Sequence, residues 1–392
     1  RLPGSGKRKQ KQSAKEKAMR ICVLGNQARA TFLFWRVLML AAKARGHSVL
    51  CLVPDGDTES NQRIRDLGVD LRHYSLDRKG LSPSNDIRTF LELKKIFGKE
   101  RIDLLFASTI KPVIYGCLAA KSAGIRHIYA TITGLGYAFE ADSLFKKLIN
   151  RLSIVLYHTA LSGIEGVFFQ NRDDAELFAS CGILKKNARV LFARGTGVDC
   201  SHFAPLPLPN RDNGLVFLSI GRLLEAKGFR EFVEAAKIVR QKYPDTLFRI
   251  LGPKEQGLGS IGEEEIASWK GSVDYLGATS DVRPEVQAAH VIVLASWREG
   301  TPTAIMEAMS MARPCIVTDV PGCREVVEDG KNGLLVPLKN PAALAEAMER
   351  LCANPELLVS MGACGRELAA EKFDANVVAN GILDDMHVPD LT

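Results

Sequence analysis

Short apolar runs alternate with longer segments of helical pattern along most of this chain, and no other feature of the sequence restricts its fold as much. In the first half, the apolar runs lie near residues 20–25, 47–53, 102–107, 127–132, 166–170 and 188–192. Strands separated by helices of about 10–15 residues form βαβ units, in which the strands pair in parallel. Apolar runs without alternation are typical of strands buried on both faces. The pattern therefore predicts an α/β fold.

A break in this pattern divides the chain. Residues 195–214 contain three prolines and no periodic apolar positions, which is typical of a linker. The alternation then restarts, with apolar runs near residues 215–221, 246–252, 273–277, 291–295 and 315–318. We therefore predict two Rossmann-like, doubly wound parallel-sheet domains, residues 19–200 and 214–372, followed by a terminal helix within residues 373–392. Ligands of such sheets bind beyond the carboxyl ends of the strands, so the cleft between the two domains is the expected site.

The charge of the chain is concentrated at its start. The formal net charge is +7, and residues 1–18 hold seven basic residues and one acid, so the tail carries +6 and the remainder +1. We interpret residues 1–18 as a disordered extension of the kind that an expression tag adds. A solvated charge run explains this tail better than nucleic-acid binding does, so we predict no nucleic-acid partner.

The cysteines, histidines and apolar runs indicate where the protein works. The nine cysteines are scattered and never spaced Cys-x-x-Cys, and the seven histidines show no metal-ligand spacing. This favours reduced core thiols in a cytosol over disulfides or zinc. No apolar run approaches the ~20 residues that a membrane-spanning helix needs. We therefore predict a cytoplasmic protein without a metal site.

Two cations follow the strand expected at residues 215–221. Arg222 and Lys227 lie in the segment Gly221-Arg-Leu-Leu-Glu-Ala-Lys-Gly228, directly beyond the carboxyl end of that strand. A planar guanidinium and a point charge at this place suit a diphosphate, because both neutralise charge on adjacent phosphates. The alternative is a pair of exposed basic residues before a helix.

Two glutamates flank a helix start further along the chain. Glu299 follows the strand expected at residues 291–295, and Glu307 lies eight positions later in an otherwise apolar segment. Thr301 is expected to cap this helix and Pro302 to occupy its first position, which makes the helix amino terminus an anion site. Glu307 then either accepts hydrogen bonds from ligand hydroxyls, which offsets the cost of its burial, or belongs with Thr303 and Ser310 to an ordinary solvent-facing stripe.

Two other patterns have simpler explanations. Residues 257–262 match Gly-x-Gly-x-x-Gly, but they start five residues beyond a strand and are followed by three glutamates, which disfavours a dinucleotide site. Asp55 and Asp57 resemble a metal-binding pair, and a turn after a strand accounts for both of them.

Arg222, Lys227, Glu299 and Glu307 together resemble the donor-site pattern of the retaining GT-B glycosyltransferases of family 4. Residues 321–337 are similar to the strand and turn that follow the glutamate helix in that family. The resemblance covers nearly all of residues 19–386 and is stronger in residues 215–340. Residues 131–137 and 194–199 are similar to a bacterial subset that adds hexoses or N-acetylhexosamines to sugars carried on polyprenyl diphosphate.

The resemblance implies a role for each site residue. Arg222, Lys227 and Glu299 would be catalytic: the two cations would hold the donor diphosphate and stabilise the leaving nucleotide, and Glu299 would contact hydroxyls of the transferred sugar. The resemblance also implies a set of nucleotide-sugar-binding residues, in which Glu307 would bind the ribose: Glu307, Gly300, Thr301, Pro302, Thr303, Gly221, Gly252, Thr133 and Gly134. Thr133 stands where many members have a histidine, so its role is not transferred. The UDP-sugar would be a co-substrate, and no cofactor or metal is expected.

The resemblance also implies an acceptor and a location. Residues 144–157 form an apolar helix with Lys146, Lys147 and Arg151 on one side, a pattern that can lie on an anionic membrane surface or belong to a core-facing helix with solvated lysines. With a lipid-linked saccharide as acceptor, the enzyme would work at the inner face of the cytoplasmic membrane in the assembly of bacterial surface glycans or glycoprotein oligosaccharides. N-acetylgalactosamine is one candidate for the transferred sugar.

Two alternative functions remain compatible with the same scaffold. A nucleotide-sugar isomerase or epimerase would convert a UDP-sugar without an acceptor, and would require acid and base residues that the sequence does not reveal. A non-catalytic nucleotide-sugar binder would bind the donor without turnover. The resemblance further implies that the terminal helix crosses back onto the first domain.

Overall fold

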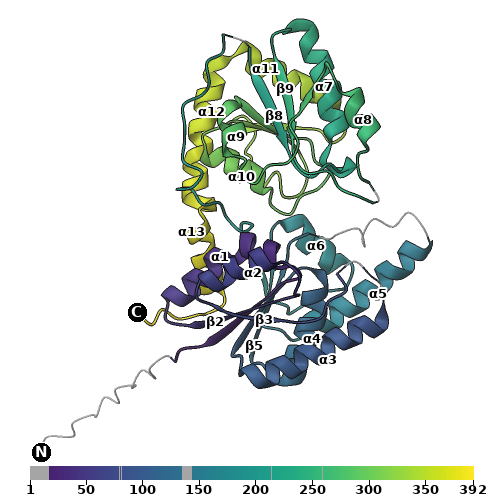
Figure 1. Cartoon of the computed structure of the whole chain (residues 1–392), viewed down its shortest axis with the longest axis vertical. Coiled ribbons are helices and arrows are strands. Elements are labelled where there is room, and N and C mark those ends of the chain that lie inside the picture. The colour runs from purple at the N-terminus through teal and green to yellow at the C-terminus, as the bar shows by residue number, and fades with distance from the viewer. Residues whose placement is uncertain (1–16, 79, 81, 135–143, 213, 258) are drawn as a thin grey trace, which may run out of the picture.

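The computed structural model describes the chain except for residues 1–16, 79, 81, 135–143, 213 and 258, and it leaves the side chains of residues 144–149 undescribed. Two α/β domains are stacked one above the other along the long axis of the molecule (Figure 1). Each is built around one parallel sheet. The predicted fold class is confirmed.

The N-terminal domain contains a seven-stranded sheet in the order β3-β2-β1-β4-β5-β6-β7. The order reverses between β1 and β4, which makes the sheet doubly wound. The sequence does not predict the strand β3, because Asp-Leu-Arg-His contains a single apolar residue and no apolar run. The strands are β1 (Arg20–Leu24), β2 (Ser48–Val53), β3 (Asp70–His73), β4 (Leu104–Ser108), β5 (His127–Ile132), β6 (Gly166–Phe169) and β7 (Val190–Phe192).

Helices cover both faces of this sheet because successive side chains of each buried strand point to opposite sides. In β1, Cys22 and Leu24 join the core beneath α3, α4 and α5, whereas Ile21 and Val23 join the core beneath α1. The helices are α1 (Ala28–Ala44), α2 (Thr58–Asp66), α3 (Pro83–Glu100), the π-helical turn η1 (Pro112–Gly116) with α4 (Cys117–Ala123), α5 (Leu144–Leu161) and α6 (Arg172–Ser180).

The C-terminal domain repeats this plan with six strands in the order β10-β9-β8-β11-β12-β13. Its strands are β8 (Val216–Ile220), β9 (Leu247–Leu251), β10 (Asp274–Tyr275), β11 (Val291–Leu294), β12 (Cys315–Thr318) and β13 (Gly333–Val336). Its helices are the 3-10 turn η3 (Glu225–Lys227), α7 (Phe229–Lys242), α8 (Glu263–Ser268), α9 (Arg283–Ala288), α10 (Thr303–Ser310), α11 (Pro341–Ala353) and α12 (Pro355–Leu368).

The chain crosses between the domains twice, and the two crossings lie side by side. α12 continues through the π-helical turn η4 (Ala369–Phe373) into α13 (Ala375–Asp385), which packs on α1 of the first domain (Figure 1). Val198, on the way out of the N-terminal domain, donates its N–H to the Phe373 carbonyl at 2.8 Å and accepts from the Ala375 N–H at 2.9 Å. The predicted return of the terminal helix to the first domain is confirmed; this helix begins at Ala375 rather than Phe373.

A buried arginine ties the linker to the C-terminal domain. The Arg313 side chain has no exposed surface and donates to the carbonyl oxygens of Leu206, Pro207, Val286, Gln287 and Met311 at 2.8–3.2 Å. Burial lowers the pKa of its guanidinium to about 10, and the carbonyl dipoles offset the cost of burying this charge. The linker from Leu206 onwards therefore belongs structurally to the second domain.

The cysteines agree with the expectation of reduced thiols, since all nine are free and none is fully exposed. Within the described residues, no helix is both long enough and apolar enough to span a membrane.

Candidate functional site

The carboxyl ends of the two sheets meet at the domain interface. Residues that follow β5 and β6 of the first domain contact the segment that follows β11 of the second. A methyl group built on Gly300 would lie 2.7 Å from the Thr133 carbonyl oxygen and would clash with the Gln170 side chain. Only glycine fits here, so the loop that carries Glu299 lies against the N-terminal domain.

Lys227 and Glu299 are in direct contact in the C-terminal domain. The Lys227 Nζ donates to Glu299 Oε1 at 2.5 Å, and the two side chains are only 21% and 13% exposed. Gly228 makes this approach possible: its φ of +71° and the lack of a Cβ let the turn η3 pack against the Ala295 carbonyl at the end of β11. Two residues that are 72 positions apart therefore form one ion pair beyond the adjacent strands β8 and β11.

Arg222 lies apart from this pair. Its guanidinium is 59% exposed and contacts the Glu255 carboxylate at 3.4 Å. Gly221 and Gly252, which follow β8 and β9, pack on each other, since a Cβ on Gly252 would collide with the Gly221 carbonyl. This close approach is possible at the φ of +153° that Gly252 adopts. The lack of a side chain at Gly252 thus lets the loops after β8 and β9 pack closely beside Arg222.

The helix that follows Glu299 starts one residue later than predicted. Pro302 is the N-cap of α10 and Thr303 its first residue, so the predicted roles of Thr301 as cap and Pro302 as first helical residue are wrong. The Thr301 hydroxyl instead donates to the Gln170 carbonyl of the other domain at 3.4 Å. The N-cap residue Pro302 makes no side-chain hydrogen bond to α10, so within the described residues the first N–H groups and the positive end of the helix dipole are available to an anion.

Glu307 has apolar neighbours on both sides in the sequence of α10. Burial raises the pKa of its carboxyl group to about 7, while the positive charge of Arg36 on α1 opposes this shift. Its neighbour Ser310 is fully buried, where it donates to the Phe203 carbonyl at 2.7 Å and accepts from Arg366 at 2.9 Å. The alternative that Thr303, Glu307 and Ser310 form a solvent-facing stripe is therefore wrong. A desolvated carboxylate of this kind gains most from a ligand that donates hydrogen bonds to it.

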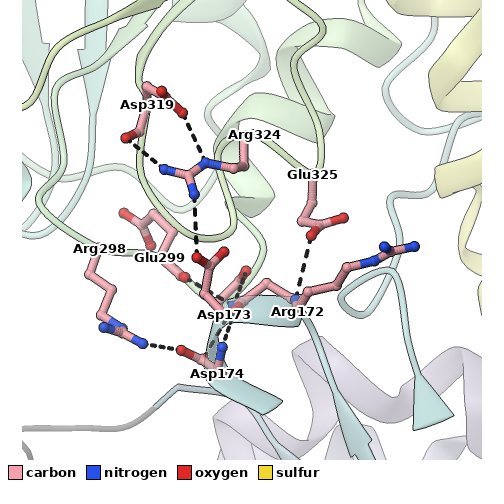
Figure 2. A network of polar contacts seen from close by, with 10 residues as sticks. Arg172, Asp173, Asp174, Arg298, Glu299, Asp319, Arg324 and Glu325 are labelled. Carbon is pink, nitrogen blue, oxygen red and sulfur yellow. Dashed lines mark hydrogen bonds and ion pairs between the residues drawn. The ribbon is translucent and has the colours of Figure 1, made fainter. Parts of the chain in front are cut away.

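Polar groups of the N-terminal domain that no sequence pattern predicted also reach this site (Figure 2). Asn171 caps α6 through its side chain, and its Nδ2 donates to the Gly300 carbonyl at 3.2 Å. Asp174 is fully buried and forms an ion pair with Arg298. The segment Asn171-Arg-Asp-Asp174 follows a buried strand and starts a helix, and this position could have marked it as part of the cleft.

Thr133 and Gly134 follow β5 at the same edge of the cleft, and the Thr133 carbonyl lies against Gly300. The next residues, 135–143, are outside the described part of the chain. The structure thus brings Thr133 to the loop that carries Glu299, through its main chain.

The patterns set aside on sequence grounds have structural roles where they are described. Asp57 caps α2 by accepting from the Ser60 N–H at 3.1 Å, and Asp55 accepts from Gly56 and Asn61. Within the described residues, no group of three or more His, Cys, Asp or Glu side chains is arranged to hold a metal ion.

Two family models match the chain, one in each domain. Residues 20–171 match a family described as glycosyl transferase 4-like, and residues 214–354 match one described as glycosyl transferases group 1. The matched segments contain every site residue that the sequence predicted, from Thr133 to Glu307.

Curated relatives cover most of the chain. An N,N'-diacetylbacillosaminyl-diphospho-undecaprenol alpha-1,3-N-acetylgalactosaminyltransferase of Campylobacter jejuni is 29% identical over 93% of this chain and 97% of its own length. A UDP-Gal:alpha-D-GlcNAc-diphosphoundecaprenol alpha-1,3-galactosyltransferase of Escherichia coli is 26% identical over 74% of this chain and 76% of its own.

Solved structures share the two-domain architecture. A sucrose-phosphate synthase from Thermosynechococcus elongatus superimposes with a TM-score of 0.76 at 18% identity, over 93% of this chain and 98% of its own. The Anabaena protein HepE, solved in complex with UDP-glucose, gives a TM-score of 0.74 at 17% identity, over 94% and 99% of the two chains. Likeness at this level of identity concerns the fold.

Proposed function

Because the chain belongs to the glycosyltransferases of group 1 with the GT-B fold, we propose that it transfers a hexose or N-acetylhexosamine from a UDP-sugar to a sugar carried on polyprenyl diphosphate. The observation that carries the proposal is the Lys227–Glu299 ion pair at the interface between the domains, directly before the amino terminus of α10. The relatives from C. jejuni and E. coli support the choice of substrates, because their names specify diphosphoundecaprenol-linked sugars as acceptors.

The reaction breaks the bond between C1 of the donor sugar and the β-phosphate oxygen, and forms a bond between C1 and an acceptor hydroxyl oxygen. The acceptor proton passes to the departing diphosphate. Negative charge grows on that diphosphate in the transition state, where fixed positive groups stabilise it most. Lys227 and Arg222 are the cations that would fill this role, and the first N–H groups of α10 would add to it.

The two glutamates would act as hydroxyl acceptors at opposite ends of the donor. Glu307, whose carboxyl group is desolvated, would accept from the ribose hydroxyls. Glu299 would accept from hydroxyls of the transferred sugar while its Oε1 accepts from Lys227, which orients the carboxylate. We propose that transfer retains the configuration at C1 and requires no metal, since charge neutralisation at the diphosphate can come from these cations.

The acceptor carries a lipid, so the enzyme would work at a membrane surface. Helix α5 supports this part of the proposal: Leu152 and Val155 are 58% and 60% exposed, and Arg151 beside them is also exposed. Lys146 and Lys147 belong to the same helix, but their side chains lie outside the described residues. Exposed apolar groups flanked by basic ones are suited to the headgroup region of an anionic bilayer.

The test is a transfer assay with a panel of UDP-sugars and a polyprenyl-diphosphate-linked sugar, in which both UDP and the lengthened glycolipid are measured. We expect acceptor-dependent release of UDP from a UDP-hexose or UDP-N-acetylhexosamine, unchanged by EDTA, with an α-linked product from an α-linked donor. Glu299→Ala and Arg222→Ala should each reduce this turnover. Turnover that survives both substitutions would contradict the assigned site.

The same assay separates the alternative functions. An isomerase or epimerase would convert the UDP-sugar without an acceptor, and a non-catalytic binder would bind the donor in calorimetry but release no UDP with any acceptor. Neither alternative is favoured by a particular observation in the structure.

A further inference from the structure

The loop that carries Glu299 is held from both domains. On its own side, the Glu299 N–H donates to the Pro321 carbonyl at 3.3 Å. On the other side, Asn171 of the N-terminal domain donates from Nδ2 to the carbonyl of Gly300 at 3.2 Å and lies 3.5 Å from that of Glu299. The main chain at Glu299 therefore has one anchor in each domain.

The residue next to Glu299 strengthens the contact between the domains. Arg298 forms an ion pair with Asp174, whose side chain is 1% exposed, whereas Arg298 itself is 39% exposed (Figure 2). The second oxygen of Asp174 accepts from Asn171 Nδ2 at 3.2 Å, and the Asp174 N–H donates to Asn171 Oδ1 at 2.8 Å. Asp174 thus fixes the amide of Asn171 on one side and the side chain of Arg298 on the other.

A second ion pair between the domains differs in its surroundings. Asp173 contacts Arg324 at 3.3 Å, and both side chains are about 40% exposed. Exposed pairs of this kind contribute little, commonly about 0–1 kcal/mol. Arg324 also bonds to Asp319 of its own domain (Figure 2). The neighbouring aspartates therefore offer a matched comparison, one buried beside the Glu299 loop and one at the rim.

We propose that Asn171 and Asp174 are positioning residues that couple the approach of the two domains to the placement of Glu299. Lys227 contacts the Glu299 carboxylate from within its own domain, but the main chain of the loop has both anchors only when the start of α6 lies against residues 298–300. The inference rests on the role of Glu299 in the proposed function. Asp174 acts through Arg298 and Asn171, because its carboxylate is buried beneath them.

The first experiment measures transfer and binding in Asp174→Asn, which keeps the shape of the side chain and removes its charge. A displacement of about 1 Å at a reacting group can cost about 10²-fold in rate, so we expect kcat to fall by about 10- to 100-fold. Binding of UDP, measured by calorimetry, should stay within about twofold, because UDP lacks the sugar that Glu299 contacts. Asp173→Asn is the control and should keep near wild-type kcat.

Arg298→Gln provides a second route, since this side chain is partly exposed and its replacement leaves the core intact. It should lower kcat as Asp174→Asn does, and the double variant should be no worse than either single one. Equal loss of kcat and of UDP affinity in both variants would mean a general structural defect and would overturn the proposal.

A cycle with Glu299→Gln separates this inference from the function on which it rests. If Asp174 acts through Glu299, Asp174→Asn should cost at most about twofold more in the Glu299→Gln background. Additive losses would overturn the coupling. Full activity of Glu299→Gln would overturn the proposed role of Glu299 itself, whereas loss in Glu299→Gln with a wild-type rate in Asp174→Asn would overturn the positioning role alone.

Discussion

The two domains turn similar parallel sheets toward one interface, but they contribute different kinds of group. The C-terminal domain contributes charged side chains that directly follow its strands, among them Lys227 and Glu299 in contact at 2.5 Å. The N-terminal domain contributes main-chain carbonyls at Thr133 and Gln170, the amide of Asn171 and the buried carboxylate of Asp174, all of which contact the loop of Glu299. The difference teaches that two domains of the same architecture can have different roles: the C-terminal domain provides the groups for the proposed chemistry, and the N-terminal domain positions them.

The largest effect is expected when a charge is removed from the site residues of the C-terminal domain. Lys227→Ala should lower kcat by about 10²–10³-fold, the loss typical for removal of one preorganised group that stabilises developing negative charge. It also leaves Glu299 without its cation. Initial rates of UDP release at saturating donor are the measurement, and Lys331→Ala, at a 68% exposed lysine, is the control.

If Asn171→Ala at the N-terminal edge reduces kcat more than Lys227→Ala does, the division of work between the domains is wrong.

The same difference between the domains explains which parts of the fold and of the site the sequence predicts. The parallel sheets and the segments 221–228 and 299–307 are local: apolar runs mark the strands, and charged residues directly follow them. Asn171 and Asp174 bear on the Glu299 loop through a contact between residues more than 120 positions apart. The position of these residues after β6 indicates that they lie at the interface, but a one-dimensional pattern does not show which loop they contact. The sequence does not predict β3, because Asp-Leu-Arg-His contains one apolar residue.

A contact between the domains also explains why the predicted start of α10 is wrong. Cap preference predicts Thr301 as the N-cap of α10. The Thr301 hydroxyl instead donates to the Gln170 carbonyl of the other domain, and Pro302 is the N-cap. Here a contact between domains overrides a local preference of about 1 kcal/mol.

The next prediction concerns the stability of the C-terminal domain. Arg313→Met should leave several buried carbonyls without donors and cost on the order of 3 kcal/mol in the free energy of unfolding, since each buried unsatisfied group costs about 1–3 kcal/mol. Hydrogen exchange should rise in residues 206–209, α9 and β12, and remain unchanged in β1 and β4. Arg324→Met, at a 41% exposed arginine, is the control. Equal exchange in both domains would mean that they unfold as one unit.

A smaller effect is expected in the pH dependence of donor binding, through Glu307 of the C-terminal domain and Arg36 of the N-terminal domain. The pKa of Glu307 is raised from 4.5 to about 7, so its ionisation opposes folding: the stability present below pH 4.5 is lost as the pH rises toward 7. Ribose hydroxyls favour the ionised form, and donor affinity should therefore increase about tenfold between pH 6 and pH 8. Calorimetry with UDP-N-acetylgalactosamine, whose phosphates do not titrate in this range, measures the effect.

Two variants sharpen this pH prediction. Glu307→Gln should give a nearly flat profile and gain stability relative to wild type as the pH rises. Arg36→Met on α1 should shift the rise in affinity to higher pH, because the Arg36 charge lowers the pKa of Glu307. A profile that Glu307→Gln leaves unchanged would mean that another group titrates.

The smallest expected effect tests whether the domains also differ toward lipid. The pair Leu152 and Val155 is exposed on one helix of the N-terminal domain, whereas an exposed residue such as Ile238 of the C-terminal domain, on α7, has no exposed apolar neighbour on that helix. Single substitutions Leu152→Ser and Val155→Ser should each weaken binding to vesicles containing anionic phospholipid by about threefold, from the loss of partly buried apolar surface. Ile238→Ser should have no effect in the same sedimentation assay. If it weakens binding as much as the α5 variants do, the membrane-facing surface is not confined to the N-terminal domain, and the two domains differ only within their cleft.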